Sequence, residues 1–205
     1  MILAVEGISA AGKTSWCRAH AAAFTVPENG RLDDAPDRLR DPGRAASFWA
    51  DRNADRWRAA LEVEARHGVA VCDTDPLKLH YAWGLLQLGE LTRETWEFER
   101  AATRDRVAAG ALGFADRVLL IVPDVAEARR RRDADPTRKR RNFERHARLG
   151  PSLVAWYRAL EAARPGTVVT SQSLPDALPD GAVRDDRYDL AAFDRLTVAL
   201  PDLSD

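Results

Sequence analysis

The sequence predicts an α/β fold built on a mainly parallel sheet. Short apolar runs rich in β-branched residues alternate with longer segments of helical period along the 205 residues, as is typical of parallel sheets covered by helices. Two runs, VAVC and VLLIV, are almost continuously apolar, as expected of strands covered on both faces. No run approaches the roughly 20 apolar residues of a membrane span, so we expect one soluble, cytoplasmic domain.

The strands and helices can be placed in order from these patterns. We expect five strands, at residues 2–6, 24–27, 69–73, 117–122 and 167–170. Helices are expected at residues 13–23, 45–67, 77–88, 92–109, 125–132, 138–149, 152–163 and 190–199. Gly68 and Gly110 stand where two helices should end, and segment 171–187, interrupted by proline and glycine, is typical of a surface loop.

A glycine-rich segment, GISAAGKT at residues 7–14, lies between the first strand and the first helix. Its spacing, G-x-x-x-x-G-K-[ST], is that of a phosphate-binding loop in which glycines let backbone amides turn toward the anion. Lys13 would reach the β- and γ-phosphates, and the Thr14 hydroxyl would bind Mg²⁺. The residues expected to bind ATP are Gly7, Ser9, Ala10, Ala11, Gly12, Lys13, Thr14 and Ser15.

Acidic residues follow the second and third strands, where parallel sheets hold their ligands. They are Glu28 in FTVPE and Asp73 and Asp75 in VAVCDTDP. Phosphoryl transfer needs one acid to position Mg²⁺, which we expect of Asp73 together with Thr14, and another to orient the attacking hydroxyl, which Glu28 or Asp75 could do. A helix cap at Asp75 and a solvated loop position for Glu28 are the structural alternatives.

A basic segment, RRRRDADPTRKRR at residues 129–141, follows the fourth strand and one expected helix. Arginines on a closing helix pair could stabilise charge on a transferred phosphoryl group and exclude water, and the candidates are Arg129, Arg132, Arg138 and Arg141. The alternatives are a solvated basic face and a nucleic-acid patch. Because 31 basic residues balance 32 acidic ones, we expect neither nucleic acid nor a membrane as partner.

Three segments, EGISAAGKT, VPEN and CDTDPL, together resemble the small P-loop kinases, and among them the ribosylnicotinamide-kinase-like domains. The resemblance spans residues 1–145 and implies a P-loop NTPase fold with the sheet order 2-3-1-4-5. It also implies a single kinase domain over residues 1–205, with an arginine-bearing lid at about residues 129–145. A looser similarity to deoxynucleoside kinases, in which a glutamate after the second strand is the base, implies that role for Glu28.

This chain departs from the family pattern where the acceptor would lie. Asn-Gly-Arg at residues 29–31 replaces Tyr-Ala-Arg, and Leu-Lys-Leu at residues 77–79 replaces Leu-Thr-Thr. The resemblance therefore supports a kinase fold and ATP better than it supports one particular acceptor. Residues expected to form the acceptor pocket are Lys78, His80, Tyr81, Trp83, Trp96 and Arg100.

The resulting hypothesis is an ATP- and Mg²⁺-dependent kinase that phosphorylates a hydroxyl of a small molecule, preferably a nucleoside or a nucleoside-like compound. One alternative is a nucleoside monophosphate kinase, whose second anionic pocket could be built from Arg31, Arg52, Arg56 and Arg100. Another is a nucleotide-dependent regulatory NTPase without a small-molecule acceptor. The expected partner is the acceptor, and a homodimer is left open.

Overall fold

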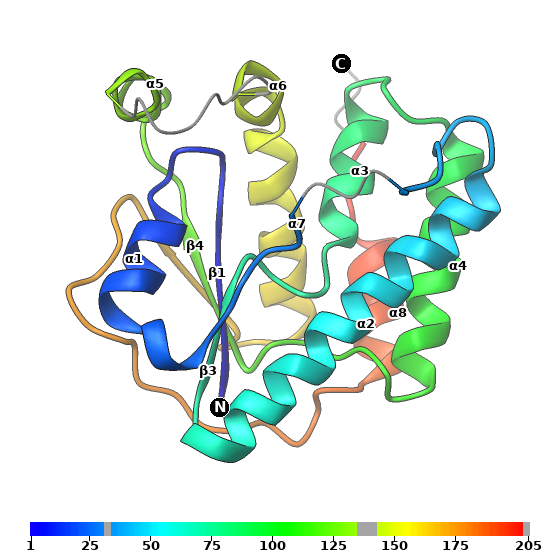
Figure 1. The fold of residues 1–205 in the computed structure, drawn as a ribbon. Helices are drawn as coiled ribbons and strands as arrows, with labels where there is room; N and C mark the ends of the chain where they lie inside the picture. The colour runs from blue at the N-terminus through cyan, green and yellow to red at the C-terminus, as the bar shows by residue number, and fades with distance from the viewer. Residues whose placement is uncertain (31–33, 135–142, 203–205) are drawn as a thin grey trace.

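A central parallel sheet organises the computed structural model, which describes residues 1–30, 34–134 and 143–202. Its strands are β1 (Ile2–Gly7), β2 (Thr25–Val26), β3 (Ala70–Asp73), β4 (Arg117–Ile121) and β5 (Val168–Ser171). They lie in the order β2-β3-β1-β4-β5, and each neighbouring pair is parallel (Figure 1). The predicted α/β class, the five strands and the order 2-3-1-4-5 are confirmed.

The helices follow the predicted sequence of elements, with differences at their ends. They are α1 (Lys13–His20), α2 (Pro42–His67), α3 (Leu79–Gln87), α4 (Arg93–Ala108), α5 (Val125–Asp133), α6 (Phe143–Arg148), α7 (Gly150–Ala163) and α8 (Leu190–Val198). The start of α2 was predicted three residues too late, because Asp41 caps the helix and Pro42 takes its first position. The first helix ends at His20 instead of continuing to residue 23, and the short 3-10 helix η1 (Ala22–Phe24) follows it.

Helices cover both faces of the sheet because the residues of each strand alternate between two cores. In β1, Ile2 and Ala4 belong to the larger core, which α2, α3, α4, α7 and α8 complete. Leu3 and Val5 belong to the smaller core on the other face, where Trp16 of α1 packs. This arrangement leaves the carboxyl ends of the strands at one edge of the molecule, near the glycine loop.

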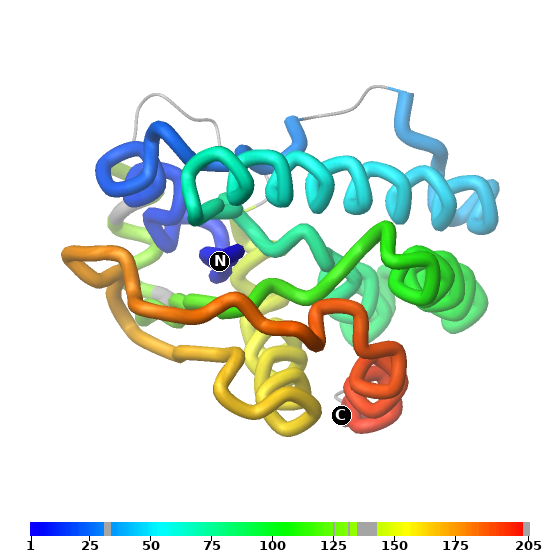
Figure 2. The backbone as a smooth tube through the Cα atoms, turned by 90° about the horizontal axis from the view of Figure 1, so that it is seen from below, coloured from blue at the N-terminus to red at the C-terminus, as the bar shows by residue number. Residues whose placement is uncertain are grey.

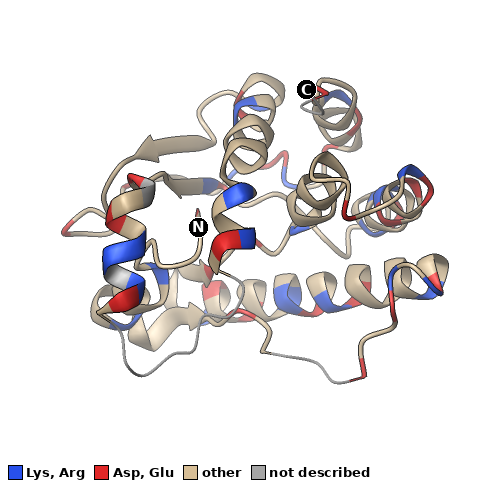
Figure 3. Ribbon diagram, turned by 90° about the horizontal axis from the view of Figure 1, so that it is seen from above, with Lys and Arg blue, Asp and Glu red and all other residues tan. Residues whose placement is uncertain are grey.

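Helix α2 has a mainly apolar side that packs in the core and a charged side that is exposed, with Arg56 as a buried exception. Trp57 is buried in the larger core. The opposite side of α2 exposes residues of both signs, among them Asp55 and Arg58, which form an ion pair, and Figure 3 shows these signs interspersed. In the part of the chain that the structure describes, no helix is long and apolar enough to cross a membrane.

The segment between β5 and α8 is more firmly anchored than the predicted surface loop. It runs across the amino-terminal end of the sheet (Figure 2), where the side chain of Arg187 is only 8% exposed. Arg187 Nε donates to Asp116 Oδ1 at 2.8 Å, and Nη1 donates to Glu64 Oε2 at 2.8 Å. The Met1 ammonium also pairs with Glu64. The prediction was wrong for Arg187 because sequence polarity does not show which loop arginine meets a buried carboxylate.

Candidate functional site

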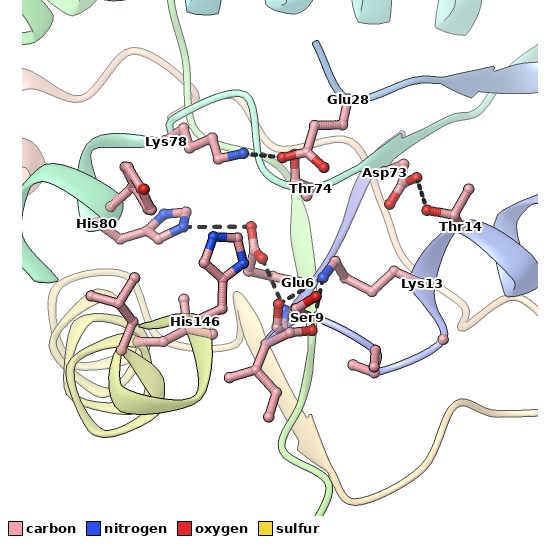
Figure 4. Close-up of a pocket in the computed structure, with 18 of the residues that line it drawn as sticks. Glu6, Ser9, Lys13, Thr14, Glu28, Asp73, Thr74, Lys78, His80 and His146 are labelled. Carbon is pink, nitrogen blue, oxygen red and sulfur yellow. Dashed lines mark hydrogen bonds and ion pairs between the residues drawn. The ribbon is translucent and has the colours of Figure 1, made fainter. Parts of the chain in front are cut away.

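A cavity of about 690 Å³ lies at the carboxyl ends of β1, β2 and β3, in the size range of small-molecule sites. The predicted residues that line it are Gly7, Ser9, Ala10, Ala11, Gly12, Lys13, Thr14, Ser15, Glu28, Asp73, Lys78, His80 and Tyr81. It is also lined by Glu6, Ile8, Arg18, Thr74, His146, Leu149 and Leu153. The glycine loop and three of the six predicted acceptor residues therefore line one cavity (Figure 4).

The glycine loop has the backbone shape of an anion cradle. Ala10 and Gly12 adopt left-handed conformations, with φ of 67° and 92°, and such residues turn neighbouring amides toward a common centre. Gly7, at φ +154°, could not carry a side chain, since a Cβ there would lie 2.5 Å from the carbonyl oxygen of Ile121. Helix α1 begins directly after the loop and adds its positive end. The loop can therefore bind a phosphate group.

Lys13 and Thr14 occupy two sides of this cradle. The ammonium of Lys13 donates hydrogen bonds to the carbonyl oxygens of Gly7, at 2.7 Å, and Ile8, at 3.2 Å. The hydroxyl of Thr14 donates to Asp73 Oδ2 at 2.6 Å. The expected hydroxyl and carboxylate are therefore in direct contact, although 59 positions separate them in the chain.

The Thr14 and Asp73 pair fits a magnesium site. Asp73 Oδ1 is buried and has no hydrogen-bond partner among the described residues, a costly state for a carboxylate oxygen unless a ligand completes it. Mg²⁺ prefers oxygen ligands and commonly takes one or two from the protein and the rest from phosphates and water. The described residues contain no cluster of three or more acidic, histidine or cysteine ligands, so the metal would depend on the nucleotide.

Glu6, at the end of β1, is a site residue that the sequence analysis missed. Its side chain is 3% exposed; Oε1 accepts the Gly7 amide at 2.9 Å and Oε2 accepts the Asp75 amide at 3.1 Å. Glu6 thus ties the glycine loop to the loop after β3. The sequence does carry a signal for Glu6, because Glu6 ends the apolar run ILAVE as Asp73 ends VAVCD, and an acid buried at the end of a strand is costly without a partner.

The charges around Glu6 explain how it can remain ionised in a buried position. Burial by itself raises the pKa of Glu6, but His80, Lys13 and Lys78 together bring that pKa below its usual value. The Nε2 atom of His80 lies 3.7 Å from Glu6 Oε2. Burial lowers the pKa of His80 to about 4, with Lys78 and Lys13 acting in the same direction against Glu6. His80 is therefore neutral near pH 7, where Lys13 and Lys78 supply the positive charge, and it adds its own charge only when it is protonated, below about pH 4.

The loop after β3 is held in a strained conformation. Thr74 has φ of 73°, which is unfavourable for a β-branched residue, and its buried hydroxyl has no partner among the described residues. Arg56 of α2 fixes the loop: Nη2 donates to the carbonyl oxygens of Asp73 at 3.0 Å and Thr74 at 2.8 Å, and Nη1 donates to that of Asp75 at 3.3 Å. Arg56 also binds the carbonyl oxygen of Pro27, so it connects the ends of β2 and β3.

Glu28 and Lys78 face each other across the acceptor side of the cavity, where their side chains form an ion pair (Figure 4). Glu28 follows β2, and Lys78 immediately precedes α3. Glu28 is 45% exposed and Lys78 30%, so both can reach a bound molecule. Leu149 and Leu153 add apolar surface to the same cavity.

Asp75 lies behind the cavity wall rather than in it. It is 2% exposed; Oδ1 accepts the Leu77 amide at 2.9 Å, and Oδ2 accepts the Tyr157 hydroxyl at 3.1 Å. Burial raises the pKa of Asp75 to about 6. Since α3 begins at Leu79 with Lys78 as its cap, Asp75 closes the preceding turn and is not the helix cap that the sequence suggested.

Three residues expected at the acceptor pocket do not line the cavity. Trp83 and Trp96 are buried in the larger core, where their size rather than their ring chemistry is used. Arg100 binds its helical neighbour Glu97, with Nη2 2.7 Å from Oε2. The helical spacing of these residues placed them on α3 and α4 but could not show which side faces the cavity.

The arginine-rich segment is described in part. Arg129 and Arg132 do not line the cavity; both bind Glu144 and so connect α5 to α6. Arg138 and Arg141 lie outside the described residues, as does Arg31. The two helices rest on the glycine loop, because Ala128 of α5 and Phe143 of α6 pack with Ala10.

No protein-family model and no curated protein sequence matches this chain. Solved structures do match, among them deoxyadenosine kinase from M. mycoides with bound dATP, at 13% identity and a TM-score of 0.58 over 83% of this chain and 90% of that one. The same enzyme with dCTP matches at 11% identity and 0.57, over 83% and 89%. With the products dCMP and dCDP it matches at 10% identity and 0.54, over 97% and 96%. At these identities the likeness shows the fold alone: this chain shares its fold with these deoxyadenosine kinases.

Proposed function

We propose that this protein is a kinase that transfers the γ-phosphoryl group of ATP, with Mg²⁺, to a hydroxyl of a small molecule, preferably a nucleoside or a nucleoside-like compound. The observation that carries the proposal is the single cavity that joins the glycine loop, the contact between Thr14 and Asp73, and Glu28. Phosphoryl transfer requires a phosphate cradle, ligands for a metal ion and a group that orients the nucleophile. The shared fold with deoxyadenosine kinases supports the same conclusion.

On the donor side, the amides of the glycine loop and Lys13 would hold the phosphates. Because Lys13 already contacts the loop carbonyls, its ammonium needs only a short movement to reach a phosphate oxygen. Thr14 and Asp73 would hold Mg²⁺, which when bound neutralises charge on the β- and γ-phosphate oxygens. Helices α5 and α6, which pack on Ala10, would act as the lid, and Arg129 and Arg132 would be its arginines among the described residues.

On the acceptor side, Glu28 would accept the proton of the attacking hydroxyl. Of the two predicted bases, Glu28 lines the cavity and Asp75 does not, which favours Glu28. The apolar and aromatic side chains of Leu149, Leu153 and Tyr81 line the same cavity and suit a planar ring. Arg56 would act through the backbone by fixing the loops that carry Glu28 and Asp73.

The positions of the remaining arginines favour a nucleoside over a nucleoside monophosphate as acceptor. The guanidinium of Arg56 donates its hydrogen bonds to backbone carbonyl oxygens. Neither Arg52 nor Arg100 lines the cavity. The described residues therefore offer few of the cations that an acceptor phosphate would need. A regulatory NTPase would have no use for the space beside Glu28.

The test is ADP release from ATP and Mg²⁺ over a panel of nucleosides, the matching monophosphates and hydroxylated antibiotics. We expect release that depends on one class of acceptor, with a nucleoside preferred over its monophosphate, and its loss in Lys13→Ala. Arg58→Gln, which changes an exposed arginine paired with Asp55 on α2, is the matched control. Slow ATP hydrolysis that no acceptor alters would overturn the proposal in favour of the regulatory alternative.

A further inference from the structure

Lys78 is a cation that lines the cavity, and neither the fold nor the proposed binding of the donor phosphates gives it a role. It immediately precedes α3, and its backbone amide is fixed by the carbonyl oxygen of Pro76 at 2.8 Å. The side chain lines the cavity and pairs with Glu28. A lysine has a flexible four-carbon stem, so its ammonium can change partners while its backbone stays in place.

Lys78 and Lys13 approach the same space from two sides. In Figure 4 Lys78 and Lys13 extend from opposite sides of the view, Lys78 toward Glu28 and Lys13 toward the glycine loop, with Glu6 between them. Both charges lower the pKa values of Glu6, His80 and His146, in each case alongside burial, which lowers the pKa of the histidines and raises that of Glu6. Two positive groups that act on the same three neighbours leave between them a position suited to a multiply charged anion.

Other cations near the site are committed elsewhere or lie on the donor side. Arg56 binds backbone carbonyls, and Arg129 and Arg132 bind Glu144. Among the described lysines and arginines, those that line the cavity are Lys13, Arg18 and Lys78. Arg18 lies on α1, the helix that follows the glycine loop, whereas Lys78 contacts Glu28 itself.

We propose that Lys78 is a catalytic residue whose ammonium leaves its ion pair with Glu28 and binds the phosphoryl group that is being transferred. This inference rests on the proposed kinase function and adds a residue to it. In the empty site, Lys78 and Glu28 neutralise each other. When ATP binds, Lys78 leaves Glu28 and donates hydrogen bonds to oxygens of the γ-phosphoryl group. The acceptor hydroxyl then takes the place of the ammonium on Glu28.

The exchange leaves the proton and the electrons balanced. The acceptor oxygen forms a bond to the γ-phosphorus while its proton passes to the Glu28 carboxylate. The bond from that phosphorus to the bridging oxygen breaks, and its electron pair leaves with ADP. Lys78 keeps its proton throughout, because it supplies charge to the phosphoryl oxygens and does not act as an acid.

The test compares the binding of ATP and ADP, each with Mg²⁺, in the absence of any acceptor. Lys78→Gln should weaken ATP binding about tenfold and leave ADP binding unchanged, since the variant loses one charge-assisted contact to the γ-phosphate alone. Lys13→Ala should weaken both. Lys78→Arg should recover part of the preference for ATP, and Arg58→Gln should change neither dissociation constant.

Turnover supplies the second measurement, with thermal unfolding as the check that each variant is folded. In Lys78→Gln we expect kcat to fall about 100-fold or more. An unchanged ratio of the ATP and ADP dissociation constants would overturn the role of Lys78, and so would a rise in the KM of the acceptor with kcat unchanged. A wild-type protein that binds ATP and phosphorylates no acceptor would instead overturn the proposed function. The ratio of the ATP and ADP dissociation constants would still show whether Lys78 contacts the γ-phosphate.

Discussion

Both edges of the sheet bury charged groups, but the two edges differ in whether the buried polar atoms have partners. At the amino-terminal edge, Asp116 and Glu64 are matched by Arg187 and by the Met1 ammonium. At the carboxyl-terminal edge, Asp73 Oδ1, the Thr74 hydroxyl and His80 Nδ1 are buried without a hydrogen-bond partner among the described residues. A satisfied network stabilises a fold, whereas orphaned polar atoms beside a cavity indicate a missing ligand.

The contrast predicts that substitutions at the amino-terminal edge cost stability and those at the other edge cost activity. The largest stability effect is expected for Arg187→Met, which would leave Asp116 buried without its cation. We expect the free energy of unfolding to fall by about 3 to 5 kcal/mol, measured by chemical denaturation. Arg195→Met, at an exposed pair with Asp189, should cost less than about 1 kcal/mol. Equal losses of unfolding free energy in Arg187→Met and Arg195→Met would show that the buried ion pairs stabilise the fold no more than an exposed pair does.

At the other edge, Lys13→Ala should lower kcat/KM about 1,000-fold, because one preorganised group is lost from the charged transition state. Its free energy of unfolding should fall far less than in Arg187→Met, by about 1 kcal/mol or less, because the lysine is near the surface and its hydrogen bonds among the described residues go to two loop carbonyls. Steady-state kinetics and denaturation of the same preparation check both values. If Lys13→Ala instead had a much lower free energy of unfolding but a normal kcat/KM when folded, Lys13 would serve stability and not activity, contrary to the contrast between the two edges.

Asp75 predicts a pH dependence at the site edge. Because its pKa rises to about 6 in the folded protein from 3.8, the folded state holds this proton more tightly than the unfolded state does. The stabilisation is fully present below about pH 4 and is lost as the pH rises through about 6. Asp75→Asn, which keeps an oxygen for the Leu77 amide, should therefore be more stable than wild type by about 2 kcal/mol at pH 8.

The gap between Asp75→Asn and wild type should close toward pH 4, as followed by denaturation at a series of pH values. His80 titrates in the opposite sense, since its pKa falls to about 4 and its contribution is lost as the pH drops below about 6.5. It is present in both proteins and cancels in the difference. Asp105→Asn, at an exposed position of α4, is the control and should show no such gap. A gap that is constant with pH would contradict the burial of an ionisable Asp75.

The smallest effect concerns the strain at Thr74. Thr74→Gly should raise the free energy of unfolding by about 1 kcal/mol, because glycine adopts the positive φ without the cost paid by a β-branched residue. This corresponds to an increase of about 2 to 4 °C in Tm, measured by calorimetry. Thr74→Ala should gain less, as it retains a Cβ. A loss of stability in the glycine variant would show that Thr74 is not strained.

The features that the sequence predicted correctly are those that depend on a few neighbouring residues. The strands and the glycine loop follow from short stretches such as VLLIV and GISAAGKT. The contact of Thr14 with Asp73 follows because the glycine loop comes directly after β1 and Asp73 ends the adjacent strand β3. Asp75 and Glu28 looked equivalent in sequence, yet only Glu28 lines the cavity. Their difference depends on the turn that buries Asp75 against Tyr157.

The contacts that could not be predicted join distant residues through side-chain packing. Arg56 lies on a long helix, and no sequence period shows that its guanidinium reaches the carbonyl oxygens after β2 and β3. The pairing of Lys78 with Glu28 joins positions 50 residues apart. The sequence predicted that Lys13 would contact the phosphates, but it did not show that Arg18 would line the same cavity.

The central claim is that the carboxyl-terminal edge transfers a phosphoryl group to a hydroxyl placed beside Glu28. The most direct measurement follows γ-labelled ATP with Mg²⁺ and a nucleoside, in wild type and in Glu28→Gln. We expect the label to appear on the nucleoside hydroxyl in wild type, and we expect Glu28→Gln to bind ATP as well but to transfer the label at least about 100-fold more slowly. Label released only as inorganic phosphate, at the same rate with and without the nucleoside, would contradict the account.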